Sequence, residues 1–197
     1  RGSTLGDTFG ICWFLRTLGD RGTEVRTVGH GGSANGQYAE LLMVPERNCA
    51  VVALANAGPD GTAYNRAVVR WALERCLGVV ERDPEPLAHD AARARAVVGS
   101  YANELMVLTI SSDGAGLTLD VRIKPELRAA AATALPPDVA PAAIGLLPGG
   151  GDEYIVTDGS LRGQRGFFTR DAGGAVVGVD LAGRLFSRVS PAAGGGA

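Results

Sequence analysis

The sequence predicts an α+β fold: an antiparallel sheet closed by a helix, followed by a mostly β, small-barrel-like domain. Three observations predict it. Strand-length apolar runs separated by turn residues fill residues 9–55. A helix-length segment with an apolar stripe follows over residues 60–78. Short alternating segments with regularly spaced turn residues then fill residues 96–190, which is typical of a small antiparallel barrel.

In the first half we expect a four-stranded antiparallel meander, because each apolar run is bounded by turn residues. The run Cys49–Ala55 carries no polar residue on either face, so both of its faces are expected to be covered, one of them by a helix. The predicted strands are 9–16, 24–28, 37–44 and 49–55.

The helix that follows is predicted from its end signals and its spacing. Asp60 or Thr62 can cap its first turn, and Gly78 suits its end. Apolar residues recur at i, i+3, i+4 and i+7, which gives one buried stripe. The stripe consists of Val69, Ala72, Leu73 and Cys76.

Two prolines, Pro84 and Pro86, indicate a domain boundary, because they hold the chain extended. The predicted organisation is a first domain, a linker with a short helix, a β domain and a disordered tail. Their ranges are 1–80, 81–95, 96–190 and 191–197.

The second half predicts a barrel or strongly curved sheet of roughly seven or eight strands. Apolar residues alternate with polar ones over 117–123 and 177–181, so one face of each strand is expected to be buried. Four aromatic residues are candidates either for plain core or for the lining of a small-ligand cavity. They are Tyr154, Phe167, Phe168 and Phe186.

Composition limits the possible partners. The net charge is -2 and the charged residues are scattered, which argues against nucleic acid. No apolar run approaches the roughly 18 residues of a membrane span, so no transmembrane segment is expected. The cysteines Cys12, Cys49 and Cys76 lie in apolar stretches without metal-ligand spacing and are interpreted as core residues, with a Cys12–Cys49 disulfide left open. The compartment stays undetermined.

The candidate functional segment is Gly29-His30-Gly31-Gly32-Ser33. It joins one of the chain's two histidines to three glycines and a hydroxyl. Glycines of this density suit a sharp turn or a close backbone approach, and histidine suits proton transfer or ligand binding. The alternative is a histidine in a glycine-rich turn with no function.

Taken in order and spacing, four segments resemble the C-terminal stretch of the serine β-lactamase and penicillin-binding-protein-like hydrolases, in the class C and esterase-type branch. Residues 96–190 resemble more loosely the lipocalin-like β domain that is often appended to such hydrolases. The resemblance implies a partial β-lactamase-like fold for the first half. The four segments are Phe9–Phe14, Gly29–Ser33 with Gly36, Met43–Pro45 and Val51–Asn56.

The resemblance implies acyl transfer from a small-molecule amide or ester through an acyl-enzyme, without cofactor or metal. It assigns catalytic roles to His30, which would bond toward a tyrosine or the substrate carboxylate, and to Ser33, whose N–H would form half of an oxyanion hole. Gly31 and Gly32 would bind substrate.

The nucleophile signature of that family, Ser-x-x-Lys, is absent, because the single lysine is Lys124 and Val121 stands three residues before it. Tyr101-Ala102-Asn103 matches the second signature only in its letters, since it follows His30. The prediction is therefore an inactive C-terminal fragment of a β-lactamase, D-alanyl-D-alanine carboxypeptidase or esterase type of hydrolase. The missing initial methionine favours a fragment over a natural noncatalytic remnant.

Two alternatives remain open. The chain can be a noncatalytic module whose β half binds a small ligand, or a structural β module. A homodimer is a further expectation, because apolar sheet surface left bare by a missing half would be hidden by a second copy.

Overall fold

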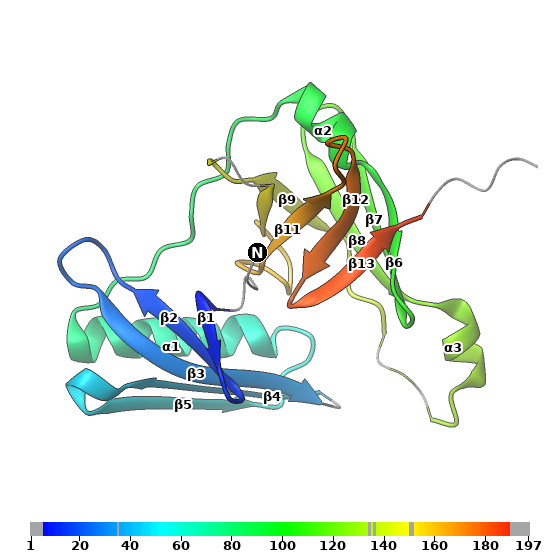
Figure 1. The fold of residues 1–197 in the computed structure, drawn as a ribbon. Helices are drawn as coiled ribbons and strands as arrows, with labels where there is room; N and C mark the ends of the chain where they lie inside the picture. Colours follow the sequence, from blue (N-terminus) through cyan, green and yellow to red (C-terminus); the bar gives the residue numbers. More distant parts are fainter. Residues whose placement is uncertain (1–5, 35, 134, 136, 150–151, 190–197) are drawn as a thin grey trace, which may run out of the picture. The chain divides into compact units, whose positions relative to one another are not determined.

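The computed structural model describes residues 6–34, 36–133, 135, 137–149 and 152–189. The chain forms two compact units, one of Arg1–Glu85 with Ser160–Gly163 and one of Pro86–Gly159 with Gln164–Ala197. The first is a sheet with a helix, and the second is a closed barrel (Figure 1). The tail predicted at 191–197 lies outside the described residues.

The first unit contains a five-stranded antiparallel sheet in the order β1-β2-β3-β4-β5. Each strand pairs with the next along the chain, as a meander does. The predicted four strands are thus five. They are β1 (Thr8–Gly10), β2 (Trp13–Leu18), β3 (Val25–Ala34), β4 (Gln37–Val44) and β5 (Cys49–Ala55), with the short 3-10 helix η1 (Pro45–Arg47) before β5.

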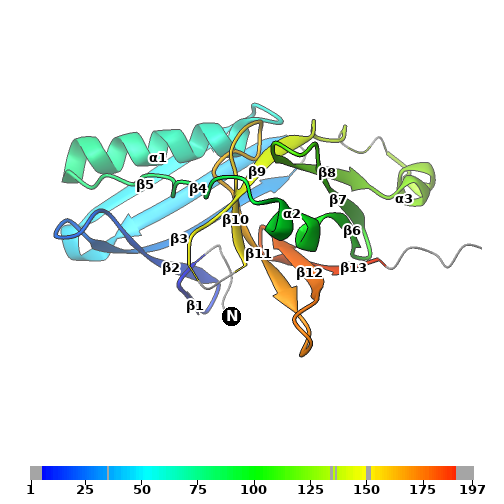
Figure 2. The same cartoon turned by 90° about the horizontal axis from the view of Figure 1, so that it is seen from above.

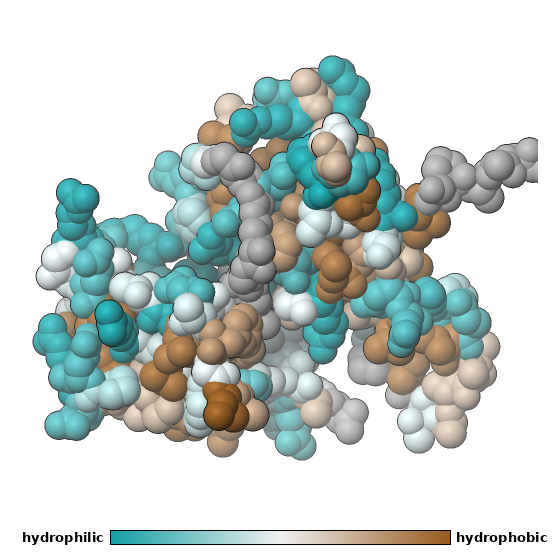
Figure 3. Space-filling view, in the orientation of Figure 1, coloured by the Kyte–Doolittle hydropathy of each residue, from teal (hydrophilic) through white to brown (hydrophobic). Residues whose placement is uncertain are grey.

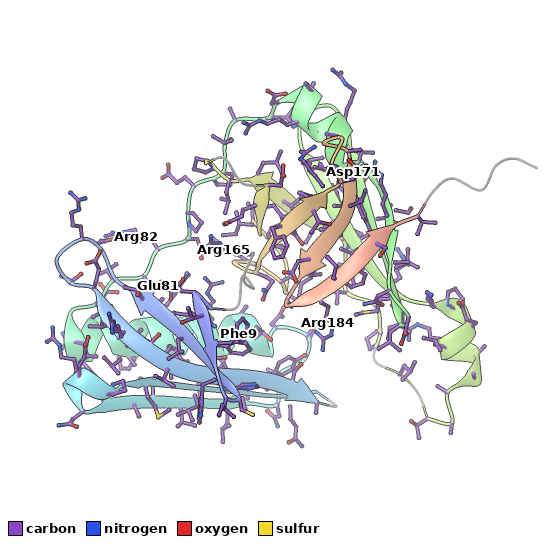
Figure 4. All side chains as sticks on the ribbon, viewed as in Figure 1. Phe9, Glu81, Arg82, Arg165, Asp171 and Arg184 are labelled. Atoms are coloured by element: carbon purple, nitrogen blue, oxygen red, sulfur yellow. The ribbon has the colours of Figure 1, made fainter. Side chains whose placement is uncertain are left out.

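The apolar run 9–16 forms a hairpin, and the expectation of one buried strand is corrected. Gly10 lies opposite Trp13, and the chain reverses at Ile11 and Cys12. Cys12 adopts φ 63, in the left-handed region that a tight reversal needs. The hairpin is hydrophobic at its tip (Figure 3), where Ile11 is 92% exposed, and Phe9 is visible on β1 in Figure 4.

Helix α1 (Gly61–Leu77) covers one face of the sheet, along β4 and β5 (Figures 1 and 2). It follows Asp60 and ends at Gly78, which adopts the left-handed φ of 67 that glycine tolerates at a helix end. Cys76, predicted in the buried stripe, is exposed. The residues that α1 buries recur every fourth position: Gly61, Asn65, Val69 and Leu73.

The opposite face of the sheet is apolar and exposed. Val52 and Leu54 of β5 are 62% and 73% exposed, and Ala50 is exposed beside them. Cross-strand register adds Met43 opposite Ala50 and Leu41 opposite Val52. The expectation that both faces of β5 are covered is therefore corrected, since α1 covers only the face that carries Ala53.

The second unit is an eight-stranded closed antiparallel barrel, which confirms the predicted small barrel. Its first strand, β6, pairs with its last, β13, so the sheet has no open edge. The strands are β6 (Gly99–Ala102), β7 (Met106–Ser112), β8 (Leu117–Ile123), β9 (Ala142–Leu146), β10 (Glu153–Val156), β11 (Arg165–Arg170), β12 (Val176–Leu181) and β13 (Arg184–Arg188). Two helices accompany them, α2 (Ala91–Val97) and α3 (Pro125–Ala130).

Large side chains form the core of the barrel unit. Tyr101 and Tyr154 are fully buried, with their hydroxyls donating to the carbonyls of Val97 and Asp180 at 2.6 and 2.8 Å. The predicted aromatic residues Tyr154, Phe168 and Phe186 belong to this core, while Phe167 is half-buried. Tyr154, Phe168 and Phe186 therefore pack as core, and Phe168 also lines a hollow of about 220 Å³ beside α2.

The turns follow the sequence signals. In the β11–β12 turn, marked by Asp171 in Figure 4, the carboxylate accepts hydrogen bonds from the backbone amides of Gly173 and Ala175, both at 2.9 Å. A register shift at Thr169 and Arg170 makes Val177 the extra residue of a bulge. The bulge leaves Val177 exposed, although the alternation of 177–181 predicts it buried.

Candidate functional site

The segment Gly29–Ser33 lies inside strand β3 and forms no turn. A Cβ on Gly29 would lie 2.7 Å from the carbonyl oxygen of Leu41, and one on Gly31 would overlap the carboxylate of Glu40. Gly29 and Gly31 are therefore required by the close approach of β4 and its side chains, which is one of the two reasons expected for glycines here, while a Cβ on Gly32 would meet nothing within 4 Å.

The end of β3 presents a free backbone edge. Residues 30–34 pair with β4 on one side, from His30 opposite Leu41 to Ala34 opposite Gln37. On the other side the pairing with β2 ends at Phe14 opposite Gly29. Within the described residues, no strand pairs with this second edge. Its amide and carbonyl groups are open to a ligand or to solvent.

The rings of Phe9, Phe14 and His30 form a cluster beside this edge. The rings of Phe14 and His30 stack at 4.9 Å between centroids with an interplanar angle of 19°. Phe9 meets Phe14 edge-on at 5.1 Å. The hairpin of β1 and β2 thus supports the imidazole of His30, which is itself exposed.

Glu40 of β4 lies directly opposite Gly31 of β3. Its carboxylate lies where a side chain of Gly31 would be. Burial raises the pKa of the Glu40 carboxyl, against the opposing positive charges of Arg16, His30 and Arg66. In the described chain it makes no ion pair within 4.0 Å.

Glu40 gives a pH-dependent prediction for stability. A carboxyl whose folded pKa is raised destabilises the fold once it ionises, so the cost is absent below the ordinary pKa of 4.5 and present at higher pH. Glu40→Gln should therefore raise the denaturation midpoint of the first unit near neutral pH and leave it unchanged below 4.5. Urea denaturation followed by the fluorescence of Trp13 and Trp71 measures this.

The exposed Glu24 provides the matched control, and Glu24→Gln should leave both midpoints unchanged. A lower midpoint for Glu40→Gln near neutral pH would contradict the prediction, because it would mean that the surrounding arginines more than offset the cost of burial.

Asn65 of α1 is the second unusual polar group. Its side chain is 2% exposed, and neither its oxygen nor its nitrogen has a hydrogen-bond partner among the described residues. Because α1 buries Gly61 against the Tyr38 ring and Val69 against the sheet core, Asn65 faces the sheet between them. Unpaired buried amides normally bind water or a ligand.

Charged residues next to this region fasten α1 to the segment that leaves it. Arg70 bonds Asp83 at 2.5 Å and Glu81 at 3.1 Å, and Arg66 bonds Asp83 at 2.9 Å. The hydrogen bond from Arg70 lowers the pKa of the Asp83 carboxyl. Glu81 is visible on this segment in Figure 4. These groups are engaged with one another, so their contribution is structural.

Of the predicted site residues, the structure places His30, Gly31, Gly32 and Ser33 together on one exposed stretch of β3. No hydrogen bond joins His30 to Ser33 within the described chain. In that same part of the chain no group of three or more His, Cys, Asp or Glu residues can hold a metal ion.

Sequence reasoning did not single out Glu40, Asn65 or Arg66. They come from β4 and α1 and are ordinary surface residue types. The pairing of β4 with β3 places Glu40, and the packing of α1 on β4 and β5 places Asn65 and Arg66. The one sequence signal was Asn65 itself, a polar residue four positions before Val69 in the buried stripe.

Among the described residues, no helix is long and apolar enough to cross a membrane. All three cysteines are free thiols, with Cys12 and Cys76 exposed and Cys49 half-buried. The prediction that the three are core residues is therefore wrong for Cys12 and Cys76.

No protein-family model matches the sequence. No curated protein matches it either. The chain is similar in structure to a crystal structure of SurE with D-Leu, with a TM-score of 0.54 and 22% identity over 94% of this chain. A further crystal structure of SurE matches with a TM-score of 0.49 and 24% identity, over 94% of this chain and 38% of that one. The chain spans 39% of the length of the SurE chain with D-Leu.

These findings correct the predicted family and function. The solved structure of similar fold with a TM-score of 0.54 is named SurE, and no family model and no curated protein matches. At 22% identity the likeness concerns the fold alone. The prediction of a serine-hydrolase fragment, with its partial β-lactamase-like fold, is therefore not retained.

Proposed function

We propose that the free edge of β3, residues 30–34, binds a short extended peptide or amino-acid derivative through its backbone. The observation that carries this proposal is the one-sided pairing of β3 after Gly29. An extended ligand that pairs with such an edge gains main-chain hydrogen bonds, which is a common mode of peptide recognition.

The side chains around the edge fit a ligand of this kind. A Cβ on Gly32 would meet nothing within 4 Å, so a ligand can approach the backbone there. The stacked rings of Phe14 and His30 form a wall that is apolar at Phe14 and polar at His30. Ser33 offers an exposed hydroxyl. In this proposal His30, Gly31, Gly32 and Ser33 are ligand-binding residues.

The choice of an amino-acid ligand has one further support. SurE, the protein of similar fold, has been crystallised with D-Leu. An apolar amino acid combines a backbone-like polar part with a side chain that suits the Phe14–His30 wall. We therefore select leucine-containing probes, in both L and D forms, for the test.

The test is binding of acetyl-Leu-Ala-amide to the full chain, in L and D forms at leucine, followed by amide chemical shifts. Shifts should concentrate on residues 30–34 of β3. A probe methylated on its backbone amide nitrogens should bind at least several-fold more weakly, because it cannot pair with the edge.

Gly32→Val is the diagnostic variant, since its side chain would fill the open space above the edge while strand geometry tolerates valine. We expect it to weaken binding roughly tenfold, a factor equal to the loss of about one or two net hydrogen bonds. Ala39→Val, on the cross-strand partner of Gly32 in β4, is the matched control and should bind normally. Equal binding by Gly32→Val, or shifts located away from β3, would overturn the proposal.

A further inference from the structure

A groove lies on the outside of the barrel unit beside α2. It consists of two hollows, of about 530 and 220 Å³, that share Arg93 and Leu146. The larger is within the size range of small-molecule sites. We propose that this groove binds an elongated apolar carboxylate of the medium-chain fatty-acid class, with Arg93 bound to the carboxylate.

One wall of the groove is a segment fixed firmly to the barrel. Leu87 donates its backbone amide to the carbonyl of Leu146 at 2.8 Å. Pro86 packs so closely on β9 that a side chain at Gly145 would overlap its ring. Asp90 then caps α2 by accepting from the amides of Ala92 and Arg93 at 2.8 and 3.0 Å. The wall is therefore preformed.

The apolar part of the groove is supplied by the barrel and by α2. Leu117 of β8 and Ile144 of β9 are each 5% exposed and line the larger hollow together with Ala94 of α2. These side chains are part of the packed barrel and give a rigid floor. An alkyl chain lying on this floor would be stabilised by the apolar surface that it removes from water.

The charges favour an anion. The groove is lined by three carboxylates, and each is already bonded. Asp90 accepts from backbone amides, Asp152 pairs with Arg170 at 2.7 Å, and Glu153 pairs with Arg165 at 2.5 Å. Arg93, exposed where the hollows meet, has no ion pair among the residues that the structure describes.

Aromatic side chains fill the interior of the barrel, which favours a ligand site on its outer surface. Tyr101 and Phe186 are fully buried inside the unit, and Phe168, 2% exposed, lines the smaller hollow beside α2. The groove beside α2 and β9 therefore offers an apolar ligand a surface outside the packed interior. A carboxylate at the Arg93 end would form charge-assisted hydrogen bonds with the guanidinium.

The experiment compares binding of decanoate and decan-1-ol to the full chain by calorimetry. Arg93→Gln should weaken decanoate binding roughly tenfold and leave decan-1-ol binding unchanged, because only the carboxylate uses the guanidinium. Arg93→Lys should retain most of the decanoate affinity. Arg95→Gln, an exposed arginine of α2 that does not line the groove, is the matched control and should bind both probes normally.

A second variant tests the position of the alkyl chain. Ala115 is exposed and lines the larger hollow, so Ala115→Trp should abolish binding of both probes by filling it. Ala172→Trp, in the exposed β11–β12 turn, is its control. The proposal is overturned if decanoate does not bind saturably, if Ala115→Trp binds normally, or if Arg93→Gln weakens both probes equally. None of these results bears on the β3 edge.

Discussion

Replacing Gly166 with Ala is expected to destabilise the barrel by about 3 kcal/mol, at the upper end of the usual cost of overpacking. Gly166 of β11 lies between Tyr154 of β10 and Leu181 of β12. A Cβ there would overlap the Asp180 carbonyl oxygen and the Tyr154 ring. Those two groups are bonded to each other at 2.8 Å inside the core, so neither can move without breaking that hydrogen bond.

The measurement for Gly166→Ala must separate the two units. Both tryptophans, Trp13 and Trp71, lie in the first unit, so their fluorescence reports its unfolding. Amide hydrogen exchange in β11 and β12 reports the barrel. We expect faster exchange in the barrel with an unchanged tryptophan transition. Gly116→Ala, where a Cβ meets nothing within 4 Å, is the control, and equal exchange in both variants would contradict the prediction.

Arg188→Ala is expected to destabilise the barrel by a similar amount, about 3 kcal/mol. The guanidinium donates to the carbonyls of Ala96 at 2.9 Å, Val98 at 2.5 Å and Val176 at 3.2 Å. It also lies over the Tyr101 ring at 5.4 Å from the centroid. Removing it leaves partly buried carbonyls without a donor and opens space above the ring.

Exchange protection of α2 and β6 measures the effect of Arg188→Ala, because the carbonyl of Ala96 lies in α2 and that of Val98 lies between α2 and β6. Arg188→Lys should recover only part of the loss, since an ammonium cannot reach three carbonyls in one plane. Arg184→Ala, on the same strand and exposed (Figure 4), is the control. If the amides of α2 keep their full exchange protection in Arg188→Ala, the guanidinium does not stabilise α2 and the prediction is wrong.

The barrel could be predicted because its signals are local. Turn residues such as Asp171 and Gly183 stand where strands end, and alternation marks the buried Leu117 and Leu119. The end of α1 was readable for the same reason, since the amide of Gly78 bonds within the last helical turn, whereas Asp60 directly precedes the helix without a capping hydrogen bond from its side chain. Local chemistry decides these features, so one sequence suffices for them.

The misread strands depended on contacts that a sequence does not display. The hairpin at Ile11 and Cys12 reverses through a positive φ on a residue other than glycine, so no turn residue marks it. The glycines of β3 suggested a sharp turn or a close backbone approach, and the structure shows the approach, at Gly29 and Gly31, to the backbone and side chains of β4. Helix α1 covers only one face of β5, although its composition suits burial on both sides.

For the candidate site, the sequence indicated His30 and Ser33 but not their surroundings. Glu40, Asn65 and Phe14 come from three other elements, and only the register of β2, β3 and β4 and the seating of α1 define their places. The family expectation rested on four short segments taken in order and spacing. It was not supported, since the solved structure of similar fold is SurE, at 22% identity.

The closure of the barrel has a consequence for the order in which the chain is synthesised. β6 and β13 are its first and last strands, and Arg188 reaches back across 92 residues to the carbonyl of Ala96. A ribosome-bound chain that has released β6–β12 still lacks this seam and exposes two unpaired strand edges. The final strand thus completes the unit in one step, and until it emerges the nascent sheet is exposed to pairing with other chains.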